Sequence, residues 1–232
     1  EKFLDIKCRQ ADLHPDAVVI VATVRALKMH GGLDKKDLNH EDLDALRKGI
    51  ENLEKHIENI SLYGIPSVVA INAFPSDTEN ELNLLREICE KKGVKVALSK
   101  VWALGADGGI ELANELLNIL DNKKSDYHPI YELDMSIEDK IKTIATKIYG
   151  ADDVVFAKKA LTKIDRYTKQ GLGNLPVCIA KTQYSLSDNP SLLGRPHGFK
   201  IEVNDIIPNA GSGFMVAICG DIMRMISWMM EK

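Results

Sequence analysis

The sequence lacks any hydrophobic run long enough to cross a bilayer, which requires about 20 consecutive apolar residues. Its longest apolar runs, residues 17–22 and 66–71, have the length of β-strands. Residues 1–5 show no basic region followed by an apolar segment, so they do not resemble a signal peptide. These absences argue against a membrane-spanning or membrane-bound protein.

Cysteine is scarce and widely spaced. The four cysteines form no CxxC pair and none of the dense spacing of a secreted disulfide scaffold; they are Cys8, Cys89, Cys178 and Cys219. This usage predicts reduced, buried thiols in a cytoplasmic protein. The formal charge is only -4, and no block of like charge resembles a nucleic-acid-binding arm, so a nucleic acid partner is disfavoured.

Motifs of metal and covalent chemistry are missing as well. The six histidines show no metal-ligand spacing, and only His30 lies inside a dense motif. The chain has no nucleophile elbow and no cysteine beside a general base. The sequence therefore predicts neither a metal site nor a covalent intermediate on a side chain.

What the first half does contain is an alternation of apolar strands and amphipathic helices. Strands are predicted at 17–22, 67–72 and 95–99, and helices at 43–60, 76–89 and 111–120. Asn39 could cap the first of these helices, whose apolar residues recur at near 3.6-residue spacing. Alternation of this kind is typical of an α/β fold with a parallel sheet and flanking helices.

The second half changes character after a polar connector at 122–126. A long helical pattern ends at Gly150, where we expect a domain boundary. Beyond it a helix is predicted at 157–168 and strands at 176–181, 199–203 and 213–218. This order indicates a smaller α+β terminal module.

The densest polar motif is residues 21–32, which we expect to leave the first strand and turn at once into a cationic, glycine-terminated loop. Open α/β sheets bind ligands beyond the carboxyl ends of their strands. Arg25 and Lys28 could therefore hold a phosphate or a carboxylate. The same two residues could equally be surface cations beside a helix.

Two aromatic residues follow the next two strands: Phe74 comes after the second and Trp102 after the third. Aromatics on neighbouring strand-end loops can sandwich a flat heterocycle, although aromatic residues are more often part of a core. The glycine-rich stretch 104–109 could let the backbone approach a ligand closely, or simply form a tight turn.

Two loops of the terminal module are weaker candidates. Lys181 begins the donor-rich stretch 181–188, which could be a wall of the site or a solvated loop. Ser212 lies in 209–213, a stretch that could present backbone amides to a phosphate or purine. Neither stretch has the GxxxxGK[ST] spacing of a phosphate-binding P-loop.

The motif at 21–32 resembles the second signature of the formate–tetrahydrofolate ligases (formyltetrahydrofolate synthetases) at every position. Further stretches resemble the same family in the same order, up to about residue 225: 1–9, 52–59, 68–78, 101–109, 139–152 and 173–188. Residues 226–232 depart from the family pattern, which typically continues with a Pro-Gly-Leu-Pro segment.

The resemblance implies a P-loop NTPase-like fold with a Rossmann-like second domain. Residues 1–63 would be a remnant of the large nucleotide-binding domain, 64–150 the folate-side domain and 151–232 the terminal domain. The implied activity is ATP-dependent ligation of formate to tetrahydrofolate through formyl phosphate, with Mg²⁺ accompanying ATP. A cytoplasmic homo-oligomer is expected.

In this family, aromatics of the matching motifs flank the pterin ring, which implies that Phe74 and Trp102 bind folate. Arg25, Lys28, Lys181 and Ser212 remain possible contacts on the anion or nucleotide side, and no catalytic residue is singled out. Because the family's P-loop has no counterpart here, we expect the chain to supply the folate side and to be inactive alone. A noncatalytic folate-binding or interaction fragment is the alternative; the unbroken signature disfavours a different nucleotide-dependent ligase.

Overall fold

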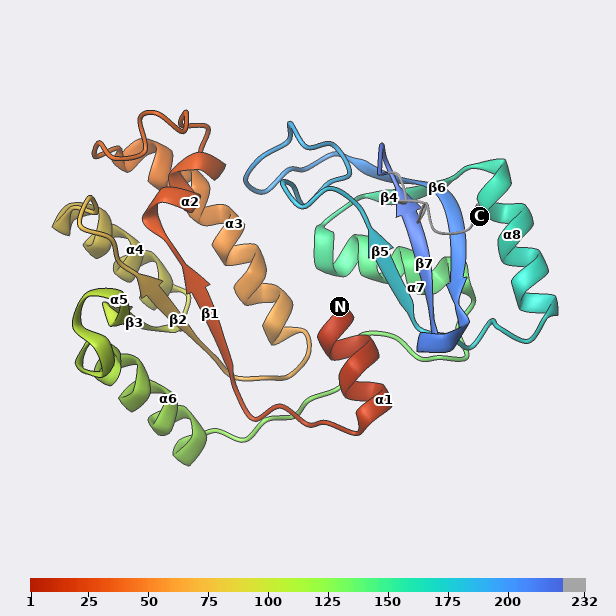
Figure 1. The fold of residues 1–232 in the computed structure, drawn as a ribbon, viewed down its shortest axis with the longest axis horizontal. Coiled ribbons are helices and arrows are strands. Elements are labelled where there is room, and N and C mark those ends of the chain that lie inside the picture. Colours follow the sequence, from red (N-terminus) through yellow and green to blue (C-terminus); the bar gives the residue numbers. More distant parts are fainter. Residues whose placement is uncertain (223–232) are drawn as a thin grey trace, which may run out of the picture. The chain divides into compact units, whose positions relative to one another are not determined.

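The computed structural model describes residues 1–222, so the predicted departure from the family pattern at 226–232 lies outside the described part. The chain forms two compact units (Figure 1). We call Lys7–Ile130 with Leu192–Pro196 the parallel-sheet unit. The mixed-sheet unit comprises Glu1–Ile6, Tyr131–Ser191 and the described residues from His197 onward.

The parallel-sheet unit is built on three strands: β1 (Val18–Ala22), β2 (Ser67–Asn72) and β3 (Lys95–Ser99). They lie side by side in the order β1-β2-β3, and both pairs are parallel. The carboxyl ends of the three strands are aligned, because Ala22 lies opposite Ile71 and Ile71 opposite Leu98. All three strands were predicted from their apolar runs, and the α/β class with a parallel sheet is confirmed.

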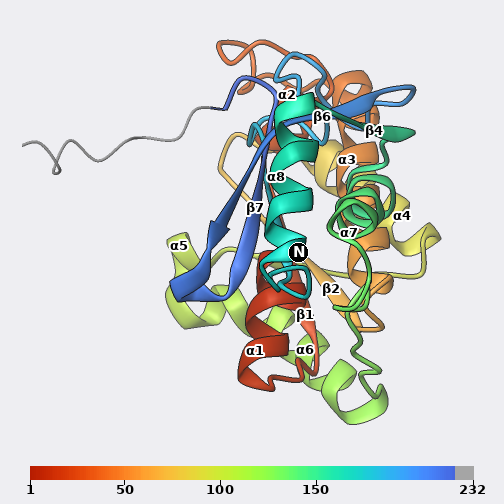
Figure 2. The same ribbon diagram turned by 90° about the vertical axis from the view of Figure 1, so that its right-hand side faces the viewer.

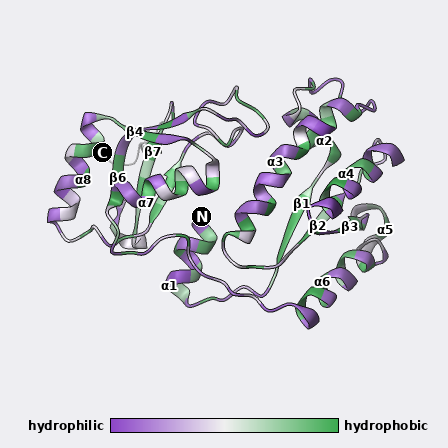
Figure 3. Cartoon of the chain, turned by 180° about the vertical axis from the view of Figure 1, so that it is seen from behind, coloured by the Kyte–Doolittle hydropathy of each residue, from purple (hydrophilic) through white to green (hydrophobic). Residues whose placement is uncertain are grey.

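Helices cover both faces of this sheet (Figure 1). Helices α3 (Leu43–Ser61) and α4 (Glu79–Lys91) pack on one face, and α6 (Ile110–Asn122) contacts β2 and β3 on the other. Figure 3 shows why the helices pack on the sheet: β1 is hydrophobic, and α3 carries both hydrophobic and hydrophilic residues along its length. The core on the α3 and α4 side includes Leu46, Ile50, Leu53, Val69, Ile71, Leu82 and Leu85.

Two local predictions were wrong. The segment after β1 is not a loop but the helix α2 (Val24–His30), which Thr23 caps by accepting a hydrogen bond from the Ala26 amide at 3.1 Å. Helix α3 is capped by Asp42 rather than Asn39, because the Asp42 carboxylate accepts from the Ala45 amide at 2.8 Å. In each case the residue that reaches the free amides of the first turn sets the boundary.

The mixed-sheet unit has four strands in the order β4-β6-β7-β5. They are β4 (Asp153–Phe156), β5 (Val177–Ala180), β6 (Lys200–Asn209) and β7 (Phe214–Cys219). The β6–β7 pair is antiparallel and the two outer pairs are parallel. The sequence did not predict β4, which is only four residues long.

Two helices, α7 (Ile137–Thr143) and α8 (Lys158–Lys169), pack beside each other on this sheet (Figure 2). The remaining helical segments are short: η1 (Lys2–Cys8), α1 (Arg9–Ala11), α5 (Val101–Leu104), η2 (Gly105–Gly109), η3 (Ile144–Tyr149) and η4 (Ala210–Ser212). No helix within residues 1–222 has the length and apolar character needed to cross a membrane. The division into domains 1–63, 64–150 and 151–232 stays a prediction.

The two glycines at the end of α2 are required for different physical reasons. Gly31 has an ordinary φ of -79°, but a β-carbon there would lie 1.8 Å from the Ala45 carbonyl oxygen of α3. Gly32 has open space around it, but its φ is +95°, which L side chains rarely adopt. The first glycine is therefore needed for close helix packing and the second for the turn.

We predict that Gly31→Ala destabilises the protein more than Gly32→Ala. The first substitution must push α2 and α3 apart, and overpacking of this kind costs about 1–3 kcal/mol or more. The second strains one backbone dihedral and costs roughly 1–2 kcal/mol. Urea unfolding of the two variants measures the difference. An equal or larger loss for Gly32→Ala would show that helix contact does not explain Gly31.

Candidate functional site

Three predicted site residues gather at the carboxyl ends of the parallel strands. Arg25 lies in the first turn of α2, directly after β1. Phe74 follows β2, and Trp102 lies in α5, directly after β3. Because the strands are parallel and level, their carboxyl ends meet at one edge of the sheet, where such folds place ligands.

The rings of Phe74 and Trp102 face each other. Their planes are 19° from parallel and their centroids are 6.4 Å apart. The Trp102 side chain is unusually open for an indole, since 57% of the residue is exposed, whereas Phe74 is half-buried. The two side chains therefore form an aromatic pair at the protein surface rather than a part of the hydrophobic core.

Hydrogen bonds hold the Trp102 indole and the backbone of Phe74 in place. The Trp102 indole Nε1 donates to the Ala73 carbonyl at 2.7 Å, which ties the indole to the residue before Phe74. The Phe74 amide donates to Asp77 Oδ2 at 2.8 Å, and the Asp77 amide donates back to the Phe74 carbonyl at 3.0 Å. The turn carrying Trp102 is closed by the Lys100 amide, which donates to the Gly108 carbonyl at 2.9 Å. The glycine-rich stretch forms the short helix η2, and a close approach of its backbone to a ligand stays a prediction.

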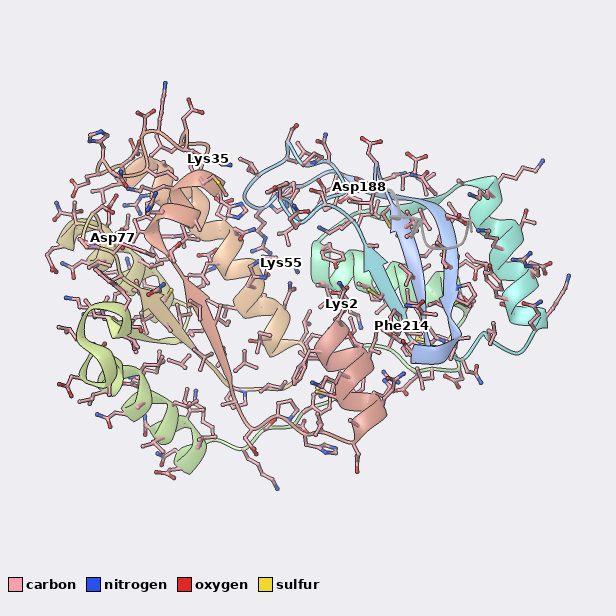
Figure 4. All side chains as sticks on the ribbon, in the orientation of Figure 1. Lys2, Lys35, Lys55, Asp77, Asp188 and Phe214 are labelled. Carbon is pink, nitrogen blue, oxygen red and sulfur yellow. The ribbon has the colours of Figure 1, made fainter. Side chains whose placement is uncertain are left out.

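Charged groups lie beside the aromatic pair. The Arg25 guanidinium carbon is 6.0 Å from the centre of the Phe74 ring, within reach of a cation–π interaction. Asp77 lies in the connection from β2 to α4 (Figure 4). Burial raises the pKa of the Asp77 carboxyl. The hydrogen bond from the Phe74 amide and the positive charges of Lys28 and Arg25 offset this rise only in part.

Lys28 has a different environment from Arg25. Its side chain is completely buried, and its ammonium group donates to Glu81 Oε1 at 2.7 Å and to the His40 carbonyl at 2.8 Å. Glu81 Oε1 also accepts from the Asp42 amide at 3.2 Å, and Oε2 from the Thr78 amide at 3.0 Å. An external anion would have to displace Glu81 to reach Lys28, so its role as an anion contact stays a prediction.

The histidine of the motif is held by a distant segment of the same unit. The Gly194 amide donates to His30 Nδ1 at 3.3 Å, and the Gly194 carbonyl accepts from Asn52 Nδ2 at 2.8 Å. Arg195 donates through both guanidinium nitrogens to Glu58, at 2.8 and 2.7 Å. Sequence reasoning missed these contacts, because more than 130 residues separate the partners and no local pattern marks them.

In the mixed-sheet unit, Lys181 organises its own loop. Its ammonium donates to the carbonyls of Thr182 and Ser185 and lies 4.5 Å from the centre of the Tyr149 ring. Burial lowers the pKa of Lys181 to about 8, although Glu1, Cys219 and Asp188 oppose the shift. These contacts hold the stretch 181–188 as an ordered loop, whatever it binds.

Ser212 lies at the other end of the same sheet. Lys181 follows the carboxyl end of β5, whereas Ser212 precedes β7, which begins beside the amino end of β5 because the two strands are parallel. The sheet therefore does not bring these two predicted residues together. Within residues 1–222, no group of three or more His, Cys, Asp or Glu residues could hold a metal ion.

We predict that Glu81→Gln strongly destabilises the parallel-sheet unit. The substitution leaves the Lys28 ammonium buried without its counter-charge, which costs on the order of 3–5 kcal/mol. Urea unfolding measures the loss, and Glu79→Gln, an exposed change in the same helix turn, is the control with an expected effect within about 0.5 kcal/mol. Adding Lys28→Met to Glu81→Gln should recover part of the loss; equal effects of the two Gln variants would contradict the ion-pair interpretation.

We also predict a pH dependence from Lys181. The folded state releases the Lys181 proton near pH 8 and the unfolded state near the ordinary value of 10.5, so between these values the unfolded state binds more protons. The contribution of Lys181 to the free energy of unfolding should therefore rise from pH 8 to 10.5. Subtracting the unfolding curve of Lys181→Met isolates this rise, with Lys169→Met, whose side chain is exposed at the end of α8, as the control for charge removal. A flat difference would refute the low pKa.

The family model described as formate–tetrahydrofolate ligase matches residues 1–227 of the 232 in the chain. The match includes the motif at 21–32, both aromatic residues and the described part of both units. The family is one of ligases of one-carbon metabolism, and it implies the joining of formate to tetrahydrofolate with ATP. The chain therefore belongs to the formate–tetrahydrofolate ligase family.

Proposed function

We propose that this chain supplies the folate side of the ligase site, with the pterin ring of tetrahydrofolate bound between Phe74 and Trp102. The observation that carries this proposal is the near-parallel arrangement of the two rings at the carboxyl edge of the sheet. Two aromatic faces give a flat ring favourable stacking on both sides, which adds to the gain from burying its apolar area.

The spacing of the rings supports the same proposal. A flat ligand in van der Waals contact with both rings needs about 7 Å between their planes, since each carbon contact is about 3.5 Å. The centroid separation of 6.4 Å sets an upper limit on the spacing of the ring planes and is close to this value, so one side chain must move outward to admit a ligand.

Arg25 is the best-placed anion contact of the four proposed from the sequence. It lies beside the aromatic pair, whereas Lys28 is occupied by Glu81 and Lys181 donates to the carbonyls of its own loop. A guanidinium can bind formate, a phosphate or a folate carboxylate with two parallel hydrogen bonds. We propose that Arg25 orients formate or its phosphate derivative toward the folate amine.

The reaction we propose for the family passes through formyl phosphate. The folate amine attacks the formyl carbon, the bond from that carbon to the phosphate oxygen breaks, and phosphate leaves with the proton that the amine gives up. No segment of residues 1–222 carries the GxxxxGK[ST] motif that would bind the phosphates of ATP. We therefore propose that the ATP side is supplied by residues other than these and that the chain alone is inactive.

The P-loop NTPase-like fold and the three-domain division belong to the same proposal. Parallel strands with helices on both faces support that fold class, although they are shared with other α/β proteins. A cytoplasmic location is supported by the four cysteines, all of which are free and buried.

We further propose that the protein associates with copies of itself. The exposed apolar side chains of α5 and α6 support this, because contiguous apolar surface often marks an interaction site; they are Val101, Leu104, Ile110, Leu117 and Leu120. The same surface would serve the alternative role of a noncatalytic interaction fragment, which titration with folate distinguishes.

We predict that Trp102→Ala and Phe74→Ala each weaken tetrahydrofolate binding about tenfold or more, because each removes one stacking face and its buried area. Calorimetric titration of the purified chain under reducing conditions measures the affinity. Trp102→Phe is the matched control, since it keeps an aromatic face and should retain most of the affinity. Unchanged affinity in both alanine variants, with lower thermal stability, would mean that the rings only support the fold.

A further inference from the structure

The two carboxylate oxygens of Asp77 have different environments. Oδ2 accepts the hydrogen bond from the Phe74 amide at 2.8 Å. Oδ1 is also shielded from solvent, yet it has no hydrogen-bond partner among residues 1–222. Asp77 thus presents one satisfied and one unsatisfied oxygen beside the residue that carries the aromatic pair.

An unsatisfied buried carboxylate oxygen needs a physical explanation. Native proteins pair the great majority of their buried polar atoms, because a buried acceptor without a donor loses its hydration and gains nothing in return. The raised pKa of Asp77 reflects the same desolvation. A donor that arrives with a ligand would remove this penalty.

The two cations that act on the charge of Asp77, Lys28 and Arg25, do not supply that donor. Lys28 donates instead to Glu81 and to the His40 carbonyl. Arg25 acts on Asp77 only as a nearby charge, and its guanidinium lies against the face of the Phe74 ring. The position of Oδ1 is nevertheless well fixed, because the carboxylate is bonded to the backbone of Phe74 itself.

We propose that Asp77 Oδ1 accepts a hydrogen bond from the amino edge of the ring bound between Phe74 and Trp102, and so selects a 2-amino-4-oxo-pyrimidine over other flat rings. This inference rests on the proposed folate site. The 2-amino group and the adjacent ring N–H of a pterin are in-plane donors, and a carboxylate oxygen is the strongest neutral-pH acceptor a protein offers. Oδ1 is shielded from solvent when the ring centroids are 6.4 Å apart, and we expect it to become accessible when the rings separate for a ligand.

The test is a cycle of two ligands and two proteins. The ligands are tetrahydrofolate and its 2-desamino-2-methyl analogue, which stacks equally well but lacks the amino donor. The proteins are the wild-type chain and Asp77→Asn, which keeps an oxygen for the Phe74 amide and places an amide NH₂ where Oδ1 lies. Asp121→Asn, an exposed change on α6, is the control for charge removal.

In the wild-type chain we expect the analogue to bind about 10- to 100-fold more weakly, the usual effect of a buried hydrogen bond to a charged group. In Asp77→Asn this difference should disappear, because tetrahydrofolate loses its acceptor and the analogue loses nothing. Asp121→Asn should keep the wild-type difference.

The outcomes separate this inference from the proposed function. Equal binding of both ligands to the wild-type chain, a comparison that needs no variant to fold, overturns the role of Asp77 alone. A difference that persists in Asp77→Asn does the same, since another group must then read the amino edge. Absence of tetrahydrofolate binding, or binding unaffected by Trp102→Ala, overturns the proposed folate site and this inference with it.

Discussion

The buried carboxylate of Glu81 joins three parts of the parallel-sheet unit that are far apart in sequence. It pairs with Lys28 of α2, accepts from the Asp42 amide before α3, and accepts from the Thr78 amide at the start of α4. A buried ion pair is favourable only when further hydrogen bonds satisfy its atoms, and here Glu81 accepts two amide bonds while Lys28 also donates to the His40 carbonyl. The start of α4 is thereby fixed, and with it the turn that carries Asp77 and Phe74.

The aromatic pair depends on that fixed turn. The Phe74 amide is bonded to Asp77, and the Trp102 indole is bonded to the Ala73 carbonyl in the same turn. Both aromatic residues are therefore positioned by one short backbone segment. Rigid support of this kind lets an open pair of rings keep its spacing without burial in a core. Arg25 reaches the pair from the neighbouring strand end, because Thr23 starts α2 directly after β1 and turns the motif into a helix.

The mixed-sheet unit shows how topology separates residues that look alike in sequence. Lys181 and Ser212 both follow or precede apolar strands in polar, donor-rich stretches. The parallel pairing of β5 with β7 places them at opposite ends of the sheet, so they cannot act on one ligand within this unit. Strand direction, which a local pattern does not encode, decided this outcome.

The sequence by itself determined the three parallel strands, the main helices and the family, because apolar periodicity and an unbroken signature are local properties. It also marked Arg25, Phe74 and Trp102, since residues after consecutive parallel strands must meet at one edge. Only the tertiary structure decided that Lys28 is buried against Glu81, 53 residues away, and that Gly194 holds His30 from 164 residues away. Such partners become neighbours only when the chain is packed, and hydrogen bonding between distant segments leaves no periodic trace in the sequence.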